Sequence, residues 1–501
     1  MDADFEDLVA RLAEIDDVQS SVALLGWDQA TYMPTGGAAA RGRQLATLEQ
    51  IAHARQTDPA LARLLDRAQP AAAREGEGSF AARLVRAARR DVERATKVPA
   101  AFVGAFAAHN ATLYERWTHA RPASDFAAVA PLLARSVELS REYAGFFAPY
   151  DHVADPLIDL TDPGVRAADV RAVFTALRAE LVPLVEAITS AAQVDDRCLR
   201  QHFPEEEQLA FGLAIAARFG YDLARGRQDR TPHPFMTKFS LGDVRITTRV
   251  RADYLSEALF STLHEAGHAL YEQHIDPRYE ATPLAQGSSM GVHESQSRLW
   301  ENLVGRSLPF WRGQYPALQA AFPAQLGAVP LDAFYRAINR VERSTVRTAA
   351  DEVTYGLHVI MRFDFELELL EGKLAVADLP EAWRERARRD LGVAPETDRD
   401  GCLQDVHWFG GHVGGAFQSY ALGNLMSAQF FEAALRAHPE IPQEIEAGRF
   451  DTLRSWLAAN IYVHGRARTP DELVRGATGK PLEAAPYLRY LRTKYGEIYG
   501  L

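Results

Sequence analysis

The sequence predicts a mainly α-helical protein that contains one small β-sheet. Long stretches of the 501-residue chain are rich in Ala, Leu, Arg and Glu, which are strong helix formers, and hold few internal prolines or glycines. Apolar residues recur at three- and four-residue steps, the spacing of one helix face. One stretch near the middle is instead rich in β-branched and aromatic residues, the composition typical of strands.

The expected helices begin close to the N-terminus. Four apolar residues there share one helix face: Leu8, Leu12, Ile15 and Val18. Three further long segments have helical composition: 79–119, 124–149 and 166–193. Turn-like breaks that contain Pro or Gly are expected at 33–37, 121–122 and 162–164.

A hairpin or small sheet is expected at residues 235–250. The turn sequence Leu241-Gly242-Asp243 divides this stretch into two strand-like halves. A helix follows directly, and a second helical pattern covers 291–302. No linker rich in Pro, Ser or one sign of charge divides the chain, so residues 1–501 are expected to form a single large unit.

Composition excludes several classes of protein. Asp and Glu number 67 against 55 Lys and Arg, a net charge of −12, which does not suit a phosphate backbone, so no nucleic-acid partner is expected. No apolar run approaches the ~18 residues of a membrane span. Residues 1–7 are acidic and lack the pattern of a signal peptide. With only two cysteines, Cys198 and Cys402, a cytoplasmic protein without a membrane partner is expected.

The most informative motif is H-E-x-x-H at His264-Glu265-Ala266-Gly267-His268. Residues four apart lie on one helix face, about 6 Å apart along the axis, so both imidazoles can reach one metal ion. Glu265 lies beside that face and can accept a proton from a water at the metal. The alternative is two ordinary histidines that face solvent.

A catalytic zinc site needs a third protein ligand and an open position for water. The downstream candidates are His274, His293, Glu294 and Glu301. Glu294 follows His268 by 26 residues, which allows a loop and a second helix that returns antiparallel. Spacing alone does not separate Glu294 from His293 or Glu301, and a surface position for Glu294 is an equal alternative.

Further short motifs follow one another along the chain. They are L-G-W-D-Q at 25–29, D-x-R-x-T at 243–247, H-E-S-Q at 293–296, V-R-x-x-A-D at 346–351 and G-x-x-Q-D-x-H-W at 401–408. Together with H-E-x-x-H, this series resembles the carboxypeptidase Taq family of metallocarboxypeptidases. The resemblance spans most of the chain, and the order of the motifs makes it specific.

The resemblance implies one catalytic domain over residues 1–501, with a zincin-like fold in which a substrate cleft and the small sheet lie beside the metal. It makes Glu294 the third ligand, with His264 and His268, of one divalent ion per chain. Zinc is expected, with cobalt or manganese as alternatives. Peptide substrates with a free C-terminus and a homodimer are also implied.

A carboxypeptidase needs a group that recognises the terminal carboxylate, and the planar fork of Arg suits that task. The family motif selects Arg347, with Arg245 in the predicted strand as the second choice. The alternative for Arg347 is an ion pair with Asp351 at i+4 on the same helix. The strand of Arg245 offers an edge for an extended peptide, whereas Asp243 and Thr247 suit a structural role equally well.

His407 and Tyr420 are the candidate hydrogen-bond donors to the reacting peptide. His407 precedes a Gly-rich loop at 410–415, and such loops can move over a site. Either side chain can stabilise a developing oxyanion. Residues 415–420 depart from the Tyr-Phe-Pro-Thr-Tyr typical of the family, which affects the expected place of Tyr420. A buried packing role is the alternative for both, and Cys402 is interpreted as a bystander thiol.

The expected reaction is the metal-dependent release of single C-terminal amino acids from peptides. Glu265 takes a proton from the attacking water and passes it to the leaving amine. One rival is an endopeptidase or aminopeptidase with the same metal chemistry, which N-blocked and C-amidated peptides would distinguish. The other is a helical scaffold that only binds metal, but a pure binding site needs no Glu265.

Overall fold

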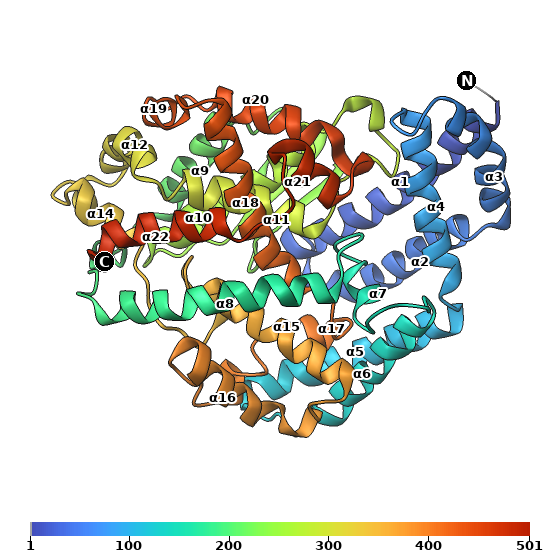
Figure 1. The fold of residues 1–501 in the computed structure, drawn as a ribbon, viewed down its shortest axis with the longest axis horizontal. Helices are drawn as coiled ribbons and strands as arrows, with labels where there is room; N and C mark the ends of the chain where they lie inside the picture. The colour runs from blue at the N-terminus through green and yellow to red at the C-terminus, as the bar shows by residue number, and fades with distance from the viewer. Residues whose placement is uncertain (1–2) are drawn as a thin grey trace.

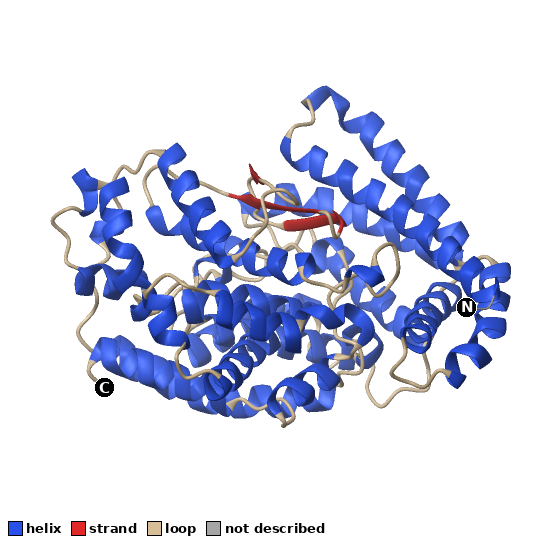
Figure 2. Ribbon diagram, turned by 90° about the horizontal axis from the view of Figure 1, so that it is seen from above, coloured by secondary structure: helices blue, strands red, loops and turns tan. Residues whose placement is uncertain are grey.

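Helices dominate residues 3–501, the part of the chain that this computed structural model describes (Figures 1 and 2). Met1 and Asp2 of the acidic N-terminal segment lie outside the described residues. The α-helices are α1 Ala3–Thr31, α2 Ala38–Gln56, α3 Pro59–Arg74, α4 Phe80–Lys97, α5 Ala100–Ala123, α6 Ala130–Gly145, α7 Asp155–Ile158, α8 Ala167–Ser190, α9 Glu205–Phe219, α10 Leu255–Gln273, α11 Met290–Arg298, α12 Leu308–Ala321, α13 Pro323–Leu326, α14 Leu331–Ile338, α15 Tyr355–Glu371, α16 Leu379–Leu391, α17 His407–Gly410, α18 Phe417–Ala437, α19 Ile441–Glu446, α20 Asp451–Asn460, α21 Pro470–Thr478 and α22 Ala485–Tyr499. The strands are β1 Gln228–Arg230, β2 Met236–Ser240 and β3 Asp243–Thr248.

The predicted hairpin at 235–250 is confirmed as part of a three-stranded sheet with the order β1-β3-β2. Strands β2 and β3 pair antiparallel, with Thr237 opposite Arg245. The short strand β1 was not predicted; it pairs parallel to β3. Because β3 is central, both of its edges are already paired, so the expectation that the strand of Arg245 offers a free edge is wrong.

Two predicted helix boundaries differ from the structure. The segment 79–119 is divided because Pro99 follows α4, and a proline disfavours helical backbone in the residue before it. In contrast, Pro122 lies in the last turn of α5, which ends at Ser124 in a left-handed conformation. The other two segments contain α6 and α8. Helix α8 nearly fills its predicted segment, whereas α6 covers only Ala130–Gly145 of the predicted 124–149.

Helix α11 packs against both α10 and α18 in the interior (Figure 1). Two glycines allow the close approach. A Cβ on Gly267 of α10 would lie 2.6 Å from the Gln296 carbonyl oxygen of α11, and a Cβ on Gly423 of α18 would lie 2.7 Å from Glu294 Cβ. Small residues at these crossings therefore determine where the side chains of α11 lie relative to α10.

Strands β2 and β3 of the small sheet pack against α10. Figure 2 shows the strands among the surrounding helices. One hydrophobic core includes residues from Phe5 in α1 to Tyr499 in α22. Among residues 3–501, no helix combines the length and apolar character that a bilayer crossing needs.

Candidate metal centre

The H-E-x-x-H motif lies in the middle of α10, which begins shortly after β3. Helical geometry places His264 and His268 on one face, and their ring centroids are 4.9 Å apart. Both imidazoles are only partly exposed, with 19% and 16% of their side-chain surface accessible. The motif therefore presents two nitrogen ligands toward α11 in a largely dehydrated setting.

Glu294 of α11 faces the two histidines. Ser289 caps this helix by accepting a hydrogen bond from the Val292 amide at 3.0 Å. Glu294 Oε2 lies 3.6 Å from His264 Nε2 and 3.5 Å from His268 Nε2. The candidate ligand atoms of the three residues, which we call the metal cluster, all lie within 4.8 Å of one another.

The other candidates for the third ligand lie behind the imidazoles. Glu301 Oε2 is 2.9 Å from His264 Nδ1, and His293 Nδ1 is 2.6 Å from His268 Nδ1. His274 Nδ1 contacts the Leu270 carbonyl instead. These positions leave the Nε2 atom of each cluster histidine to face Glu294.

The donor set fits a divalent metal ion. When Nδ1 of each cluster histidine donates its proton to the partner behind it, Nε2 keeps a lone pair that is directed at Glu294. Two imidazoles and one carboxylate are a common ligand set of catalytic zinc sites, and cobalt or manganese also accept it. Three protein ligands leave a coordination position for water or substrate.

Electrostatics favour the protonation states that a metal requires at His268 and Glu294. At His264, burial opposes protonation, but Glu294 and Glu301 outweigh it and raise the pKa of the imidazole. Burial lowers the pKa of His268 to about 3, so its imidazole is neutral. Burial alone would raise the pKa of Glu294, but Arg298, His264 and His268 outweigh it and lower this pKa well below its usual range. Arg298 donates from Nε to Glu294 Oε1 at 2.7 Å and contacts Glu301 at 3.3 Å.

Glu265 and His264 line one cavity of about 560 Å³, together with Arg298, Arg347 and Tyr355. Glu265 is buried, and burial raises the pKa of its carboxyl to about 7. A metal ion nearby would lower this value, because positive charge favours the carboxylate. The cavity thus brings a carboxylate that can carry a proton next to the metal cluster.

Arg347 lines this cavity, and the alternative interpretation of this residue, an ion pair with Asp351 on one helix, is wrong. Arg347 begins a short 3-10 turn, and its Nη2 pairs with Asp405 Oδ1 at 2.8 Å while Nη1 donates to Tyr355 Oη at 2.9 Å. Asp351 precedes α15 and instead accepts hydrogen bonds from Thr354. The ion pair between Arg347 and Asp351 does not form because the 3-10 turn ends at residue 349, so the two residues do not share a helix.

Arg245 lies in β3 and is not among the residues that line the cavity of Glu265 and Arg347. In the described part of the chain, Asp243 binds its guanidinium through two hydrogen bonds of 2.8 and 2.7 Å. Its guanidinium carbon lies 4.3 Å from the ring centre of Trp27 and 4.9 Å from that of Phe239. These contacts hold α1 against the sheet. They give the D-x-R-x-T motif a structural role.

His407 and Tyr420 form a pair, with His407 Nε2 3.1 Å from Tyr420 Oη. Burial lowers the pKa of His407 to about 4, so the ring is neutral. Tyr420 lies one turn before Gly423 on α18, and its ring centre is 5.3 Å from the guanidinium carbon of Arg347. His407 also lines a mostly apolar cavity of about 410 Å³ with the loop 410–415.

Three contributors to this site were not predicted from the sequence. Arg298 lies at i+4 from Glu294 on the same helix, a spacing that the sequence already contains. Asp405 belongs to the quoted Q-D motif, but its pairing with Arg347 spans 58 residues of sequence. Tyr355 carries no motif that would have selected it.

Comparisons with known proteins agree with this fold and identify its family. A family model described as carboxypeptidase Taq (M32) metallopeptidase matches residues 7–495. Thermostable carboxypeptidase 1 of Thermus thermophilus is 40% identical over 100% of this chain and 99% of that protein. Carboxypeptidase 1 of Bacillus subtilis is 35% identical over 99% of this chain and 98% of that protein. A crystal structure of an M32 carboxypeptidase from Deinococcus radiodurans R1 superposes with a TM-score of 0.97 at 48% identity, covering 100% of both chains.

Proposed function

Because the chain belongs to the carboxypeptidase Taq (M32) metallopeptidase family and is a metal-dependent carboxypeptidase, we propose that it releases single C-terminal amino acids from peptides with Glu265 as the general base. One observation carries this proposal. Glu265 opens into the same cavity as His264, and His264, His268 and Glu294 converge within 4.8 Å.

The proposed ligands are His264, His268 and Glu294. A divalent ion held there supplies Lewis-acid polarisation of the scissile carbonyl and a water of lowered pKa. Glu265 accepts a proton from the attacking water and delivers it to the leaving nitrogen, acting first as base and then as acid. Its burial supports both halves of this task, since a carboxyl with a raised pKa holds a proton more readily between the two steps.

We assign recognition of the terminal carboxylate to Arg347, which lines the cavity that Glu265 lines. Asp405 and Tyr355 fix its guanidinium, so the charge is in place before substrate binds. Tyr420 is the proposed donor to the substrate carbonyl oxygen, with His407 as its hydrogen-bonded partner. Arg245 has no part in this proposal, because its guanidinium is held by Asp243 of the sheet and by Trp27 of α1.

Several finer assignments rest on the same resemblance. Zinc is the proposed ion, since the ligand set of two histidines and one glutamate is typical of zinc peptidases. A homodimer in the cytoplasm and a single catalytic domain over residues 1–501 are also proposed. Metal analysis and sedimentation of the purified protein test the first two of these assignments.

Digestion of a short peptide tests the proposed function directly. Mass spectrometry should show a ladder that shortens from the C-terminus by one residue at a time, and a chelator should abolish it. An N-acetylated peptide should be cleaved normally, whereas a C-amidated peptide should resist. Internal fragments, or shortening from the N-terminus, would contradict the proposal.

A further inference from the structure

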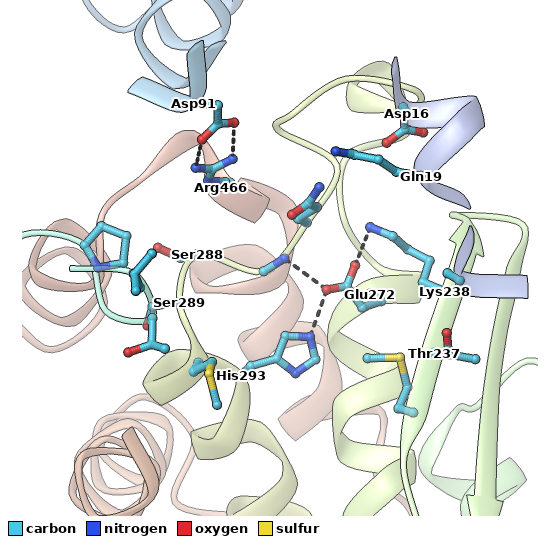
Figure 3. Close-up of a pocket in the computed structure, with 18 of the residues that line it drawn as sticks. Asp16, Gln19, Asp91, Thr237, Lys238, Glu272, Ser288, Ser289, His293 and Arg466 are labelled. Carbon is cyan, nitrogen blue, oxygen red and sulfur yellow. Dashed lines mark hydrogen bonds and ion pairs between the residues drawn. The ribbon is translucent and has the colours of Figure 1, made fainter. Parts of the chain in front are cut away.

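A chain of hydrogen bonds extends from the metal cluster to the wall of a second cavity, and Figure 3 shows its part from His293 through Glu272 to Lys238. His268 Nδ1 lies 2.6 Å from His293 Nδ1, and His293 Nε2 lies 2.8 Å from Glu272 Oε1. Lys238 Nζ then donates to Glu272 Oε2 at 2.8 Å. His293, Glu272 and Lys238 all line this cavity, which has a volume of about 700 Å³.

Only one arrangement of protons satisfies this chain while His268 serves as a ligand. His268 must keep the lone pair of Nε2 for the metal, so its proton is on Nδ1 and is donated to His293 Nδ1. His293 then carries its own proton on Nε2 and donates it to Glu272. Glu272, paired with Lys238, is an ionised acceptor that fixes the tautomer of His293.

The ring of His293 is also held sterically. A Cβ on Gly287 would lie only 2.5 Å from His293 Cδ2, so this loop approaches the ring as only glycine allows. The ring centre of Tyr271 lies 5.2 Å from that of His293. The amide of Gly287 donates to Glu272 Oε1 at 2.9 Å, so one loop contacts both His293 and its partner.

From this geometry we infer that His293 is a positioning residue, which holds His268 in the tautomer and orientation that bind the metal. The inference rests on the proposed ligand set, because His293 contacts the metal site only through His268 and matters only if His268 is a ligand. The two ligand histidines are thus oriented differently. A carboxylate, Glu301, accepts directly from His264, whereas His268 reaches its carboxylate, Glu272, through a second imidazole.

The test measures metal affinity of the full-length protein, with zinc alone as the probe and a chromogenic chelator as competitor. His293→Phe keeps the volume of the ring but removes the acceptor, and we expect zinc to bind about 10- to 100-fold more weakly. His293→Asn places an amide oxygen near the position of Nδ1 and should recover part of the loss. The visible spectrum of the cobalt-loaded protein should change in His293→Phe.

The chain offers a matched control in His152. Its Nε2 lies 2.8 Å from Glu371 Oε1, the same pair at the same distance as His293 and Glu272, and it is similarly buried. His152→Phe should leave zinc affinity unchanged. If His152→Phe weakens binding as much as His293→Phe does, or if His293→Phe binds zinc within threefold of wild type, the inference is wrong.

Two further variants keep the test decisive. Glu272→Gln retains the ring of His293 and should weaken zinc binding less than His293→Phe; if His293→Phe does not fold, wild-type affinity in both Glu272→Gln and His293→Asn overturns the inference. His268→Ala separates the two proposals. Should it retain zinc, the proposed ligand set fails; should it lose zinc while the His293 variants keep it, only the positioning role fails.

Discussion

Glu265 differs from the other carboxylates around the metal cluster in its surroundings. Glu294 and Glu301 contact Arg298, and Glu272 contacts Lys238. Within residues 3–501, Glu265 has no arginine or lysine within ion-pair distance, which is consistent with its raised pKa. A carboxyl that is neither paired nor solvated can take up a proton at little cost, as a general base must.

Substitution of Glu265 by Gln should separate metal binding from turnover. The amide preserves shape but cannot accept the proton of the attacking water, so kcat should fall by about 10²- to 10⁴-fold. Zinc content should stay at the wild-type level, because Glu265 is not a proposed ligand. Substantial turnover in the metal-loaded variant would exclude Glu265 as the base.

Substitution of Arg347 by Met should weaken the binding of the substrate's terminal carboxylate. Loss of a charge-assisted contact should raise KM for a free-acid peptide by about 10- to 100-fold. Arg362 Nε remains 2.6 Å from Asp405 Oδ2, so the variant does not leave that buried carboxylate unpaired. The matched C-amidated peptide, measured as an inhibitor, should bind both proteins equally; an equal loss for that peptide would argue for a structural role.

At the same scale, the sequence predicts local relations better than distant ones. Helical periodicity alone implies that His264 and His268 share a face, and α10 has that face. Helical spacing offered only Asp351 as an alternative ion-pair partner of Arg347, whereas the chain folds back to bring Asp405 there. Distant pairings of this kind depend on tertiary packing, which periodicity does not encode.

Among the elements, the sequence predicted part of the sheet, but it predicted the ends of the helices less well. The turn at Leu241-Gly242 indicated the hairpin, but β1 has only three residues and pairs through a parallel ladder that no local turn indicates. Helix α11 passes into a π-helical segment at Leu299–Val304, which contains Glu301. Such wider turns occur at functional sites and have no simple sequence pattern.

Helix α15 contains a carboxyl group that should make stability depend on pH. Glu366 accepts a hydrogen bond from Trp408 Nε1 at 2.9 Å, and burial raises its pKa to about 8. The folded state therefore retains a proton that the unfolded chain releases above its ordinary pKa of 4.5. This contribution to stability is complete below that value and is lost as the pH rises through about 8.

Glu366→Gln should remove this dependence, because the amide resembles the protonated carboxyl. The variant's gain in unfolding free energy over wild type should grow from pH 5 to pH 8 and then level off, reaching at least ~1 kcal/mol. Denaturant unfolding across that range measures it. Glu368→Gln on the same helix is the control, and the same trend in that variant would exclude Glu366 as the cause.

On the scale of the whole molecule, the metal cluster joins segments that are distant in sequence. His264 and His268 come from α10 and Glu294 from α11, while α18 packs against Glu294 through Gly423. The mainly α-helical class with a small sheet beside the site was predictable because it depends on composition and motif order. The packing of these helices was not, because it depends on close contacts such as those of Gly267 and Gly423.

Removal of the metal should therefore destabilise the whole fold. Without an ion, the paired ligands of α10 and α11 lose a shared partner, and any ligand that binds only the folded state stabilises it by mass action. Zinc at 100 times its dissociation constant should add about 2.7 kcal/mol to the unfolding free energy, which calorimetry with and without chelator can measure.

Glu294→Gln should abolish most of this difference, because it weakens the link between the two helices. A chelator effect of equal size in that variant would mean that the stabilising ion binds elsewhere on the chain.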